Sequence, residues 1–292
     1  MKTITLIKDF LELLKSNNSK IINTKIDLCS ESFSDPLNLT GYTFSEYVSF
    51  KEITFKDEVK FDDCVFKKDV DFSESIFEAD TYFRNVVFAK NVSFENTEAK
   101  EGTIDFNGVS FQKVNFEKIV FKHPNFINMY PQKPNREFTK ENFSSQESVR
   151  AVKAFLEEQR NNTEATRYFV VEREFLLHKL KNNKNYIRLV PLLFDKYISD
   201  YGTNYFRVFI SILVIYTMLY FFLNYIFCFW IGKHVSFNEF LGVVIPLKSL
   251  GIQQTSEILS IIPIWVTVLM RIITIYFVYQ FIRSFRTDTK RV

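Results

Sequence analysis

The sequence predicts an α+β chain with two dissimilar halves: a stacked β-coil, then helices of which two are long enough to cross a membrane. Two observations carry this prediction, a ladder of phenylalanines in the N-terminal half and two long apolar runs in the C-terminal half. Of the 292 residues 47% are apolar, and 34 Phe stand against only 7 Gly and 7 Pro. This composition excludes collagen-like and disordered chains, and the net charge of +3 does not suggest a nucleic-acid-binding protein.

The phenylalanine ladder has a period that neither an α-helix nor a single β-strand produces. Its core alternates steps of six and five residues and consists of Phe44, Phe50, Phe55, Phe61, Phe66, Phe72, Phe77, Phe83, Phe88 and Phe94. The ladder extends backwards to Leu28, Ala99 replaces one rung, and from Phe106 to Phe126 every step is five residues. A small or β-branched residue precedes most rungs by two positions. The pattern predicts a repeated unit with two inward-facing side chains.

Each unit of this ladder can form one short side of a coil. Coils stacked at about the 4.8 Å spacing of β-strands would pair their backbones and place the rings on one another. The pattern resembles the pentapeptide-repeat family over residues 26 to 127, and this resemblance implies a right-handed quadrilateral β-helix as the domain 26–130. Cys64 occupies an inward small-residue position, which favours core packing over a reactive thiol.

The outward positions of the coil are charged. Residues 26–127 contain 19 Asp and Glu against 11 Lys and Arg, a net charge of 11 − 19 = −8. An acidic rod suggests a DNA mimic, as in the pentapeptide-repeat proteins that protect topoisomerases. However, lysines interrupt the acidic surface, so a solvated face is favoured and nucleic acid is not an expected partner. These are Lys51, Lys56, Lys60, Lys67 and Lys68.

The open ends of such a coil would expose strand edges and need caps. Residues 1–25 are predicted to cap the first end with a helix over Ile4–Lys15, whose apolar residues recur at helical spacing. At the other end Pro124, Pro131 and Pro134 are expected to break regular pairing and to mark a boundary.

Residues 140–200 are predicted to form an amphipathic helical connector, with two helices that separate near Asn161 and Asn162. Its sequence resembles the helical connector expected in pentapeptide-repeat proteins with membrane tails. The local match consists of Glu164, Ala165, Tyr168, Phe169 and Glu172. The favoured interpretation of this segment is a solvated helical hairpin without chemistry of its own.

Two apolar runs predict a membrane domain over 205–286. Val208–Ile231 has 24 residues without a charge, and Ile258–Ile282 has 25 residues with one, so each is long enough for the bilayer core. The connecting loop would span 232–257, and residues 287–292 form a basic tail. Lys and Arg concentrate before the first run and after the second, which predicts cytoplasmic termini. The family resemblance favours a bacterium and therefore its inner membrane.

Catalytic motifs are absent from the sequence: it has no GxSxG, no HExxH and no P-loop. The three histidines, His123, His178 and His234, belong to different segments, and the three cysteines form no CxxC pair. The sequence therefore predicts no enzyme, no metal site and no cofactor.

The two spans and their loop resemble the two-helix, re-entrant-loop plan of simple ion channels, but Leu250–Gln254 does not form the TVGYG-like strand of a potassium filter. Arg271 lies about halfway through the second span, where a charge is costly, and Asn224 is one polar group that could face it. Two hypotheses follow. The first is a membrane-anchored, homo-oligomeric scaffold whose β-helix binds an unknown protein. The alternative is an oligomeric, ion-channel-like pore with a degenerate filter.

Overall fold

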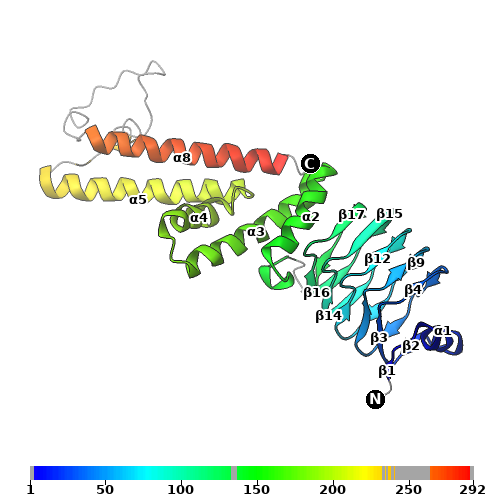
Figure 1. Ribbon diagram of the computed structural model, residues 1–292. Coiled ribbons are helices and arrows are strands. Elements are labelled where there is room, and N and C mark those ends of the chain that lie inside the picture. Colours follow the sequence, from blue (N-terminus) through cyan, green and yellow to red (C-terminus); the bar gives the residue numbers. More distant parts are fainter. Residues whose placement is uncertain are drawn as a thin grey trace. The chain divides into compact units, whose positions relative to one another are not determined.

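The computed structural model describes residues 3–132, 137–231, 234, 236, 237, 240 and 264–289. The chain divides into two compact units, Met1–Asn183 and Lys184–Val292 (Figure 1). The division lies inside the segment 140–200 for which the sequence predicts one connector. The first unit holds a β-solenoid and three α-helices, and the second holds helices α4, α5 and α8.

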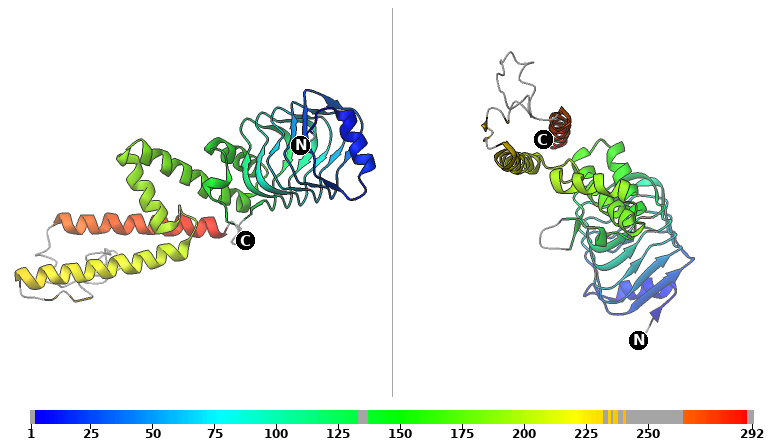
Figure 2. Two further views of the ribbon diagram at one scale, coloured as in Figure 1. Left: turned by 90° about the horizontal axis from the view of Figure 1, so that it is seen from below. Right: turned by 90° about the vertical axis from the view of Figure 1, so that its left-hand side faces the viewer.

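The β-solenoid has about six coils, and short parallel strands line up between coils in four ladders, one for each side (Figure 2). The first ladder contains β1 (Thr3–Ile4), β3 (Lys25–Cys29), β7 (Val48–Lys51), β11 (Val70–Asp71), β14 (Val87–Ser93) and β16 (Ser110–Asn115). The second contains β2 (Ile21–Ile22), β6 (Thr43–Phe44), β10 (Val65–Phe66), β14, β16 and β18 (Tyr130–Pro131). The third contains β4 (Ser32–Phe33), β8 (Thr54–Phe55), β12 (Ile76–Phe77), β15 (Glu98–Asp105) and β17 (Val120–Asn125). The fourth contains β5 (Leu37–Asn38), β9 (Val59–Lys60), β13 (Thr81–Tyr82), β15 and β17.

The four ladders are not four separate sheets. The strands β14, β15, β16 and β17 each turn a corner of the coil and belong to two ladders, so the described strands merge into one sheet of ten strands and one of eight.

The register between coils explains the step lengths of the ladder. Val48 pairs with Val70, and the separation of these partners in the sequence equals four sides of six, five, six and five residues. Near the end of the solenoid Ser110 pairs with Tyr130, and this shorter separation equals four sides of five residues. The change from alternating steps to steps of five is therefore a change in the length of one coil.

Every second corner of the coil contains a residue in the left-handed conformation. From Ser30 to Asn96 these positions recur without a gap, and each lies two residues after a rung. At one such corner the N–H of Ile53 donates to the carbonyl of Phe50 at 3.2 Å, while Glu52 between them has φ 57°. A positive φ at the third residue of a turn suits Gly and Asn, and Gly occupies this position at two corners, Gly41 and Gly108.

The predicted rungs are the core of the solenoid. All ten phenylalanines from Phe44 to Phe94 are at most 1% exposed. Rings that follow one another along a column stack with centroids 4.7 to 5.4 Å apart. Rings of neighbouring columns meet edge to face, as Phe72 does with Phe61 and Phe83 at 5.4 Å. Ala99 is buried and pairs with Phe77, so it does replace a rung.

The N-terminal cap is helix α1 (Ile7–Ser16). Its only fully buried residue is Phe10, whose ring meets Phe33 and Phe50 edge on at 6.3 and 6.1 Å. The prediction of a helix from Ile4 was wrong, because Ile4 lies in β1 and pairs with Ile26 at the end of a ladder. The chain adds this strand to the solenoid before the helix covers the end.

Pro124 and Pro131 do not break the solenoid as predicted, since both are paired within it, and Pro134 lies outside the described residues. Pro124 pairs with Ile104 in the fourth ladder. In this ladder the N–H groups donate to carbonyls of the following coil; the N–H of Val59, for example, donates to the carbonyl of Asp80. The coil of Pro124 is the last on that side. An N–H group at position 124 would have no following coil to donate to, so the N–H that proline lacks is not missed. At Pro131 the neighbouring residues Tyr130 and Gln132 donate to the preceding coil instead.

The C-terminal end of the solenoid is covered by a 3₁₀-turn (Lys140–Asn142) and by helices α2 (Gln146–Glu158) and α3 (Asn162–Asn182). The two helices separate where the sequence predicts, with the side chains of Ser145 and Asn161 as N-caps. They are not a hairpin solvated on all sides, since one face of each shares the solenoid's core. The buried residues are Val149, Val152, Leu156, Ala165, Tyr168 and Val171.

The second unit contains α4 (Tyr186–Ser199) and two long helices that lie side by side, α5 (Tyr205–Ile231) and α8 (Ile264–Thr289) (Figure 1). Helix α5 covers the first predicted span. Helix α8 covers the second from Ile264 and continues past Ile282 into the predicted tail. Residues 258–263, most of the predicted loop 232–257 and residues 290–292 lie outside the described residues.

Candidate functional site in the paired apolar helices

Helices α5 and α8 are each long and apolar enough to cross a membrane. Their most apolar stretches are Tyr205–Ile226 with 22 residues and Val268–Arg286 with 19. At 1.5 Å per residue these stretches are about 33 and about 28 Å long, close to the roughly 30 Å of a hydrocarbon core. Only 11% of the first and 22% of the second is buried. The core helix of a soluble domain would be mostly buried, so these two differ from one.

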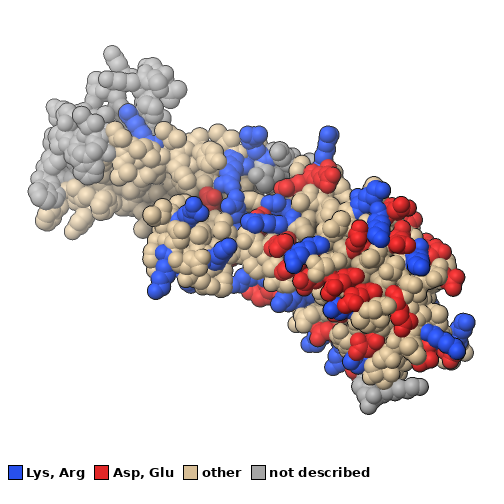
Figure 3. Space-filling model, viewed as in Figure 1, with Lys and Arg blue, Asp and Glu red and all other residues tan. Residues whose placement is uncertain are grey.

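The outer surface of the pair consists of large apolar side chains. Phe206, Phe221 and Phe229 on α5 are all more than half exposed. On the face in Figure 3 the described part of these helices is mostly uncharged and carries a few Lys and Arg side chains, whereas acidic and basic groups intermingle over the first unit. A contiguous apolar surface of this kind requires a covering that water does not provide.

A polar contact joins the two helices inside this apolar surface. The Tyr216 hydroxyl donates to the Thr274 hydroxyl at 2.8 Å, and that hydroxyl donates to the carbonyl of Met270 at 2.8 Å. Leu223 and Met270 are buried between the helices, with Phe240 of the loop packed on them. The hydrogen bond fixes the rotation of one helix against the other.

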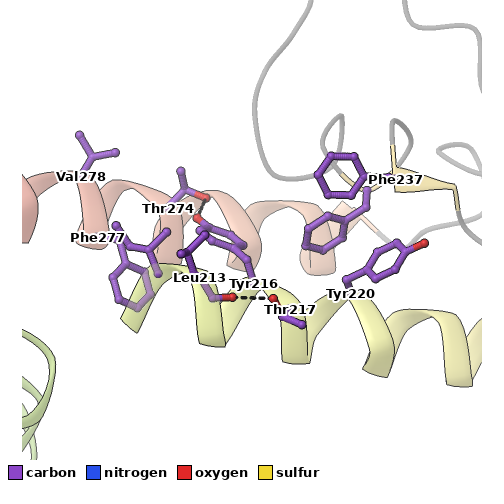
Figure 4. A pocket seen from close by; sticks show the side chains of 10 residues that line it. Leu213, Tyr216, Thr217, Tyr220, Phe237, Thr274, Phe277 and Val278 are labelled. Atoms are coloured by element: carbon purple, nitrogen blue, oxygen red, sulfur yellow. Dashed lines mark hydrogen bonds between the residues drawn. The ribbon is translucent and has the colours of Figure 1, made fainter. Parts of the chain in front are cut away.

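Beside this contact is a cavity of about 360 Å³ (Figure 4). Tyr216, Thr217 and Tyr220 of α5 line one side, and Thr274 and Phe277 of α8 line the other. Apart from the hydroxyl groups of these residues the lining is apolar, and the Thr217 hydroxyl already donates to the Leu213 carbonyl at 2.7 Å. The cavity suits an apolar chain better than a hydrated ion.

The predicted polar pair does not form a joint site among the described residues. Asn224 is half-buried and donates to the Tyr220 carbonyl at 3.2 Å. Arg271 lies in α8 with an exposed side chain, and no hydrogen bond or ion pair joins it to another described residue. The role of Arg271 therefore depends on what surrounds the helix pair.

A polar junction at the other end of α8 was not predicted. The carboxylate of Asp195 in α4 accepts from the Gln280 side chain at 2.7 Å and from the Arg283 guanidinium at 3.2 Å. Arg283 also donates to the Tyr201 carbonyl, and a side chain at Gly202 would meet the Arg283 Nε at 2.8 Å. Gln280 thus joins the end of α8 to α4. Its partner Asp195 gave no sequence signal, because a single acid in a helix usually faces water.

The solenoid surface carries ion pairs that join successive coils. Arg84 binds Asp62, 22 residues earlier, through two nitrogens at 3.2 and 2.6 Å, and its guanidinium lies over the Tyr82 ring. Lys100 and Glu78 form a similar pair at 3.5 Å. The lysines predicted to interrupt the acidic surface include two paired ones, Lys51 beside Glu74 and Lys60 beside Glu58. Within residues 26–127 four of the 11 basic side chains form ion pairs, so the acidic excess of this surface remains.

No nucleophile or metal cluster emerges from the described residues. The Cys64 thiol donates to the Leu39 carbonyl at 2.9 Å inside the core, and burial raises its pKa to about 12. His123 and His178 are exposed on different elements, and His234 is also exposed. In the part of the chain that the structure describes, no group of three His, Cys, Asp or Glu is placed to hold a metal ion.

The comparison with protein families identifies the repeat. The family model described as pentapeptide repeats (9 copies) matches residues 39–87, which lie within the four ladders. The N-terminal domain is a pentapeptide-repeat solenoid. The pentapeptide-repeat coil extends beyond the matched residues in both directions, from β1 to β18. Neither the curated proteins nor the solved structures include a match to this chain.

Proposed function

We propose that this chain is a membrane-anchored, non-enzymatic scaffold: α5 and α8 insert into a bilayer and the pentapeptide-repeat solenoid binds a protein partner in the cytoplasm. The observation that supports anchoring best is the exposed apolar surface along both helices. A lipid bilayer is the covering that such a surface requires. The excess of basic residues at Arg207, Arg283 and Arg286 supports cytoplasmic ends, and for a bacterium the inner membrane.

The solenoid is suited to a scaffold role because its shape does not depend on a ligand. Stacked rings fill its interior, helices cover both ends, and its polar atoms pair along the surface. A rigid surface of this type binds with little loss of conformational entropy. The partner is a protein rather than DNA, since the net charge of −8 over residues 26–127 repels a phosphate backbone.

Membrane anchoring can be tested at exposed residues of α5, where a charged side chain would be tolerated if the helix lay in water but would be costly in a bilayer. Leu213 and Val214 are both about half exposed near the middle of α5. Replacing both with Lys adds about 5–7 kcal/mol to the cost of insertion, on a scale of about 2.5–3.5 kcal/mol for each charge. We expect the full chain to resist alkaline extraction from membranes, and the Leu213→Lys, Val214→Lys variant to be released. Equal fractionation of the two proteins would refute anchoring, and Leu213→Phe, Val214→Ile is the matched control.

Arg271 supports a second candidate function, an oligomeric pore. An exposed arginine in the middle of a span needs protein, water or headgroups around it. Two helices cannot enclose a pore, so several copies would have to place Arg271 toward a common axis. In this case Arg271→Leu alters conductance in planar bilayers. If Arg271 instead faces lipid, the variant inserts more tightly by about 2.5–3.5 kcal/mol and the wild type conducts no ions.

A further inference from the structure

Helix α4 has an apolar face that nothing among the described residues of its own unit covers. Ile187, Val190, Phe194 and Tyr197 recur at intervals of three, four and three residues, so they share one side of the helix. All four are exposed, Ile187 by 89% and Tyr197 by 68%. The opposite side is used within the unit, where Leu189 and Leu192 are buried. Thus α4 is apolar on two faces, and only one of them is satisfied.

The contacts of α4 place it beside the C-terminal end of α8, where the apolar sequence of α8 gives way to charged residues. Asp195 binds Gln280 and Arg283, and Arg283 is the first charged residue after Arg271 along α8. The hydroxyl of Ser211, near the start of α5, lies 3.5 Å from the Ile198 carbonyl at the end of α4. Both long helices therefore hold α4 at the same end of the pair.

The direction of α4 fits a position along a surface. It runs across the common axis of α5 and α8 instead of parallel to it, as the two views in Figures 1 and 2 show. If the long helices cross a bilayer, a helix crosswise to them lies in the plane of the membrane. An amphipathic helix in that plane buries its apolar side about 5–10 Å into the headgroup region.

The charges around α4 match an anionic surface. From residue 184 to 207 the chain has two acids against four basic residues, which are Lys184, Arg188, Lys196 and Arg207. Both acids form ion pairs with an arginine. Asp195 pairs with Arg283 at 3.2 Å, and Asp200 pairs with Arg207 at 3.8 Å. With four basic residues against two acids the segment has a net charge of +2, and each Lys or Arg close to an anionic leaflet contributes about 1 kcal/mol of attraction.

We infer that α4 is an interfacial helix whose face of Ile187, Val190, Phe194 and Tyr197 inserts among anionic lipid headgroups at the cytoplasmic surface. This inference rests on the proposed function, because it requires α5 and α8 to span the bilayer. In addition to the two membrane-spanning helices, the anchor would then contain a helix that lies parallel to the membrane surface. Through the Asp195 contact, the state of the lipid surface is linked to the end of α8.

The inference can be tested with spin labels on the full chain in vesicles of phosphatidylcholine with phosphatidylglycerol. Cys29 is exposed on the solenoid and serves as the aqueous reference, Leu213→Cys serves as the bilayer reference, and Phe194→Cys reports on α4. Cys228→Ser is present throughout, Cys29→Ser is added whenever a new cysteine is introduced, and Cys64 is buried and stays unlabelled. Accessibility to oxygen and to a water-soluble nickel complex gives the depth of each label.

We expect the Phe194→Cys label to lie between the two references, with the same depth for Tyr197→Cys one turn away. Removing phosphatidylglycerol, or introducing Lys184→Gln with Arg188→Gln, should make both labels shallower. A water-exposed label at both α4 positions, with Leu213→Cys in the bilayer, refutes the interfacial helix alone. Labels closed to both reagents would indicate a second copy or a protein partner on this face, which also refutes it. An aqueous label at Leu213→Cys refutes the proposed anchoring and the interfacial helix together.

Discussion

The two units use the same side chain in opposite ways. In the solenoid a phenylalanine such as Phe72 is surrounded by other rings, two stacked and others edge on, and is fully buried. On α5 a phenylalanine such as Phe221 is 65% exposed and has one close ring, Tyr220. The solenoid thus completes its own apolar interior, whereas the helix pair leaves most of its apolar surface for its surroundings. The difference shows that phenylalanine content alone does not tell a core from a membrane surface; the spacing does.

The largest expected effect comes from removing one ring in each unit. Phe72→Ala should destabilise the solenoid by about 3–5 kcal/mol, because it loses burial and leaves a cavity between fixed neighbours. Phe221→Ala should cost less than about 1 kcal/mol in detergent, because its ring has few protein contacts. Alkylation of the buried Cys64 thiol at increasing urea concentration, with Cys29→Ser and Cys228→Ser, reports the opening of the solenoid, and the loss of helical circular dichroism in detergent on heating reports on the helix pair. Equal shifts for both variants would remove the distinction between the two units.

A smaller effect is expected at the helical cap that closes the solenoid. The carboxylate of Glu172 on α3 accepts from Arg150 and Lys153 on α2 at 2.7 and 2.6 Å. Burial opposes its ionisation, but these hydrogen bonds outweigh burial and the pKa of Glu172 is lowered. The contribution of Glu172 to the stability of the fold is therefore complete above the ordinary glutamate pKa of about 4.3. It is lost as the pH falls through the lower pKa that Glu172 has in the folded protein.

Glu172→Gln should accordingly lower the stability at neutral pH by about 1 kcal/mol, a modest value since Arg150 is largely exposed. The difference from the wild type should shrink as the pH drops below about 4. Urea midpoints at several pH values measure both effects, read by circular dichroism because thiol alkylation requires the thiolate and stops at acid pH. A constant difference down to pH ~3 would show that the carboxylate acts through packing and not through its charge.

Effects of similar size but of opposite sign are expected at the corners of the coil. Gly108 has φ 74° and Lys118 has φ 54°, so both occupy the left-handed conformation. Gly108→Ala should destabilise by about 1–2 kcal/mol through backbone strain, and its new Cβ would also meet the Asn85 Oδ1 at 2.5 Å. Lys118→Gly should stabilise by up to about 1 kcal/mol. If both variants shift the urea midpoint in the same direction, the corner conformations do not determine the difference.

The sequence predicted the parts of the fold that depend on period and left out those that depend on single contacts. Every rung from Phe44 to Phe94 is buried as predicted, because a fixed step repeats the same side of the coil. The start at Ile4 was wrong because one apolar residue fits a strand as well as a helix. The proline boundary was wrong because the pattern does not show which N–H groups lack an acceptor.

Contacts between distant segments explain the rest. The ring of Phe155 on α2 packs on Phe126 at the end of the solenoid, and this meeting leaves no periodic trace in either segment. The same holds for Asp195 and Arg283, which are 88 residues apart. Amphipathic spacing predicted the helices of the connector but not the surfaces that would cover them.

The constant length of the earlier coils has a consequence for how such a protein can change in length. Along these coils an insertion or deletion equal to one complete coil returns every side chain to its own column, and with it every corner residue and cross-coil ion pair. A change that is not a whole number of coils would put a charged side chain where a ring belongs. The rod can therefore grow or shorten only in whole turns, by duplication or loss of a complete coil, while α1 and the α2–α3 hairpin keep fitting the ends.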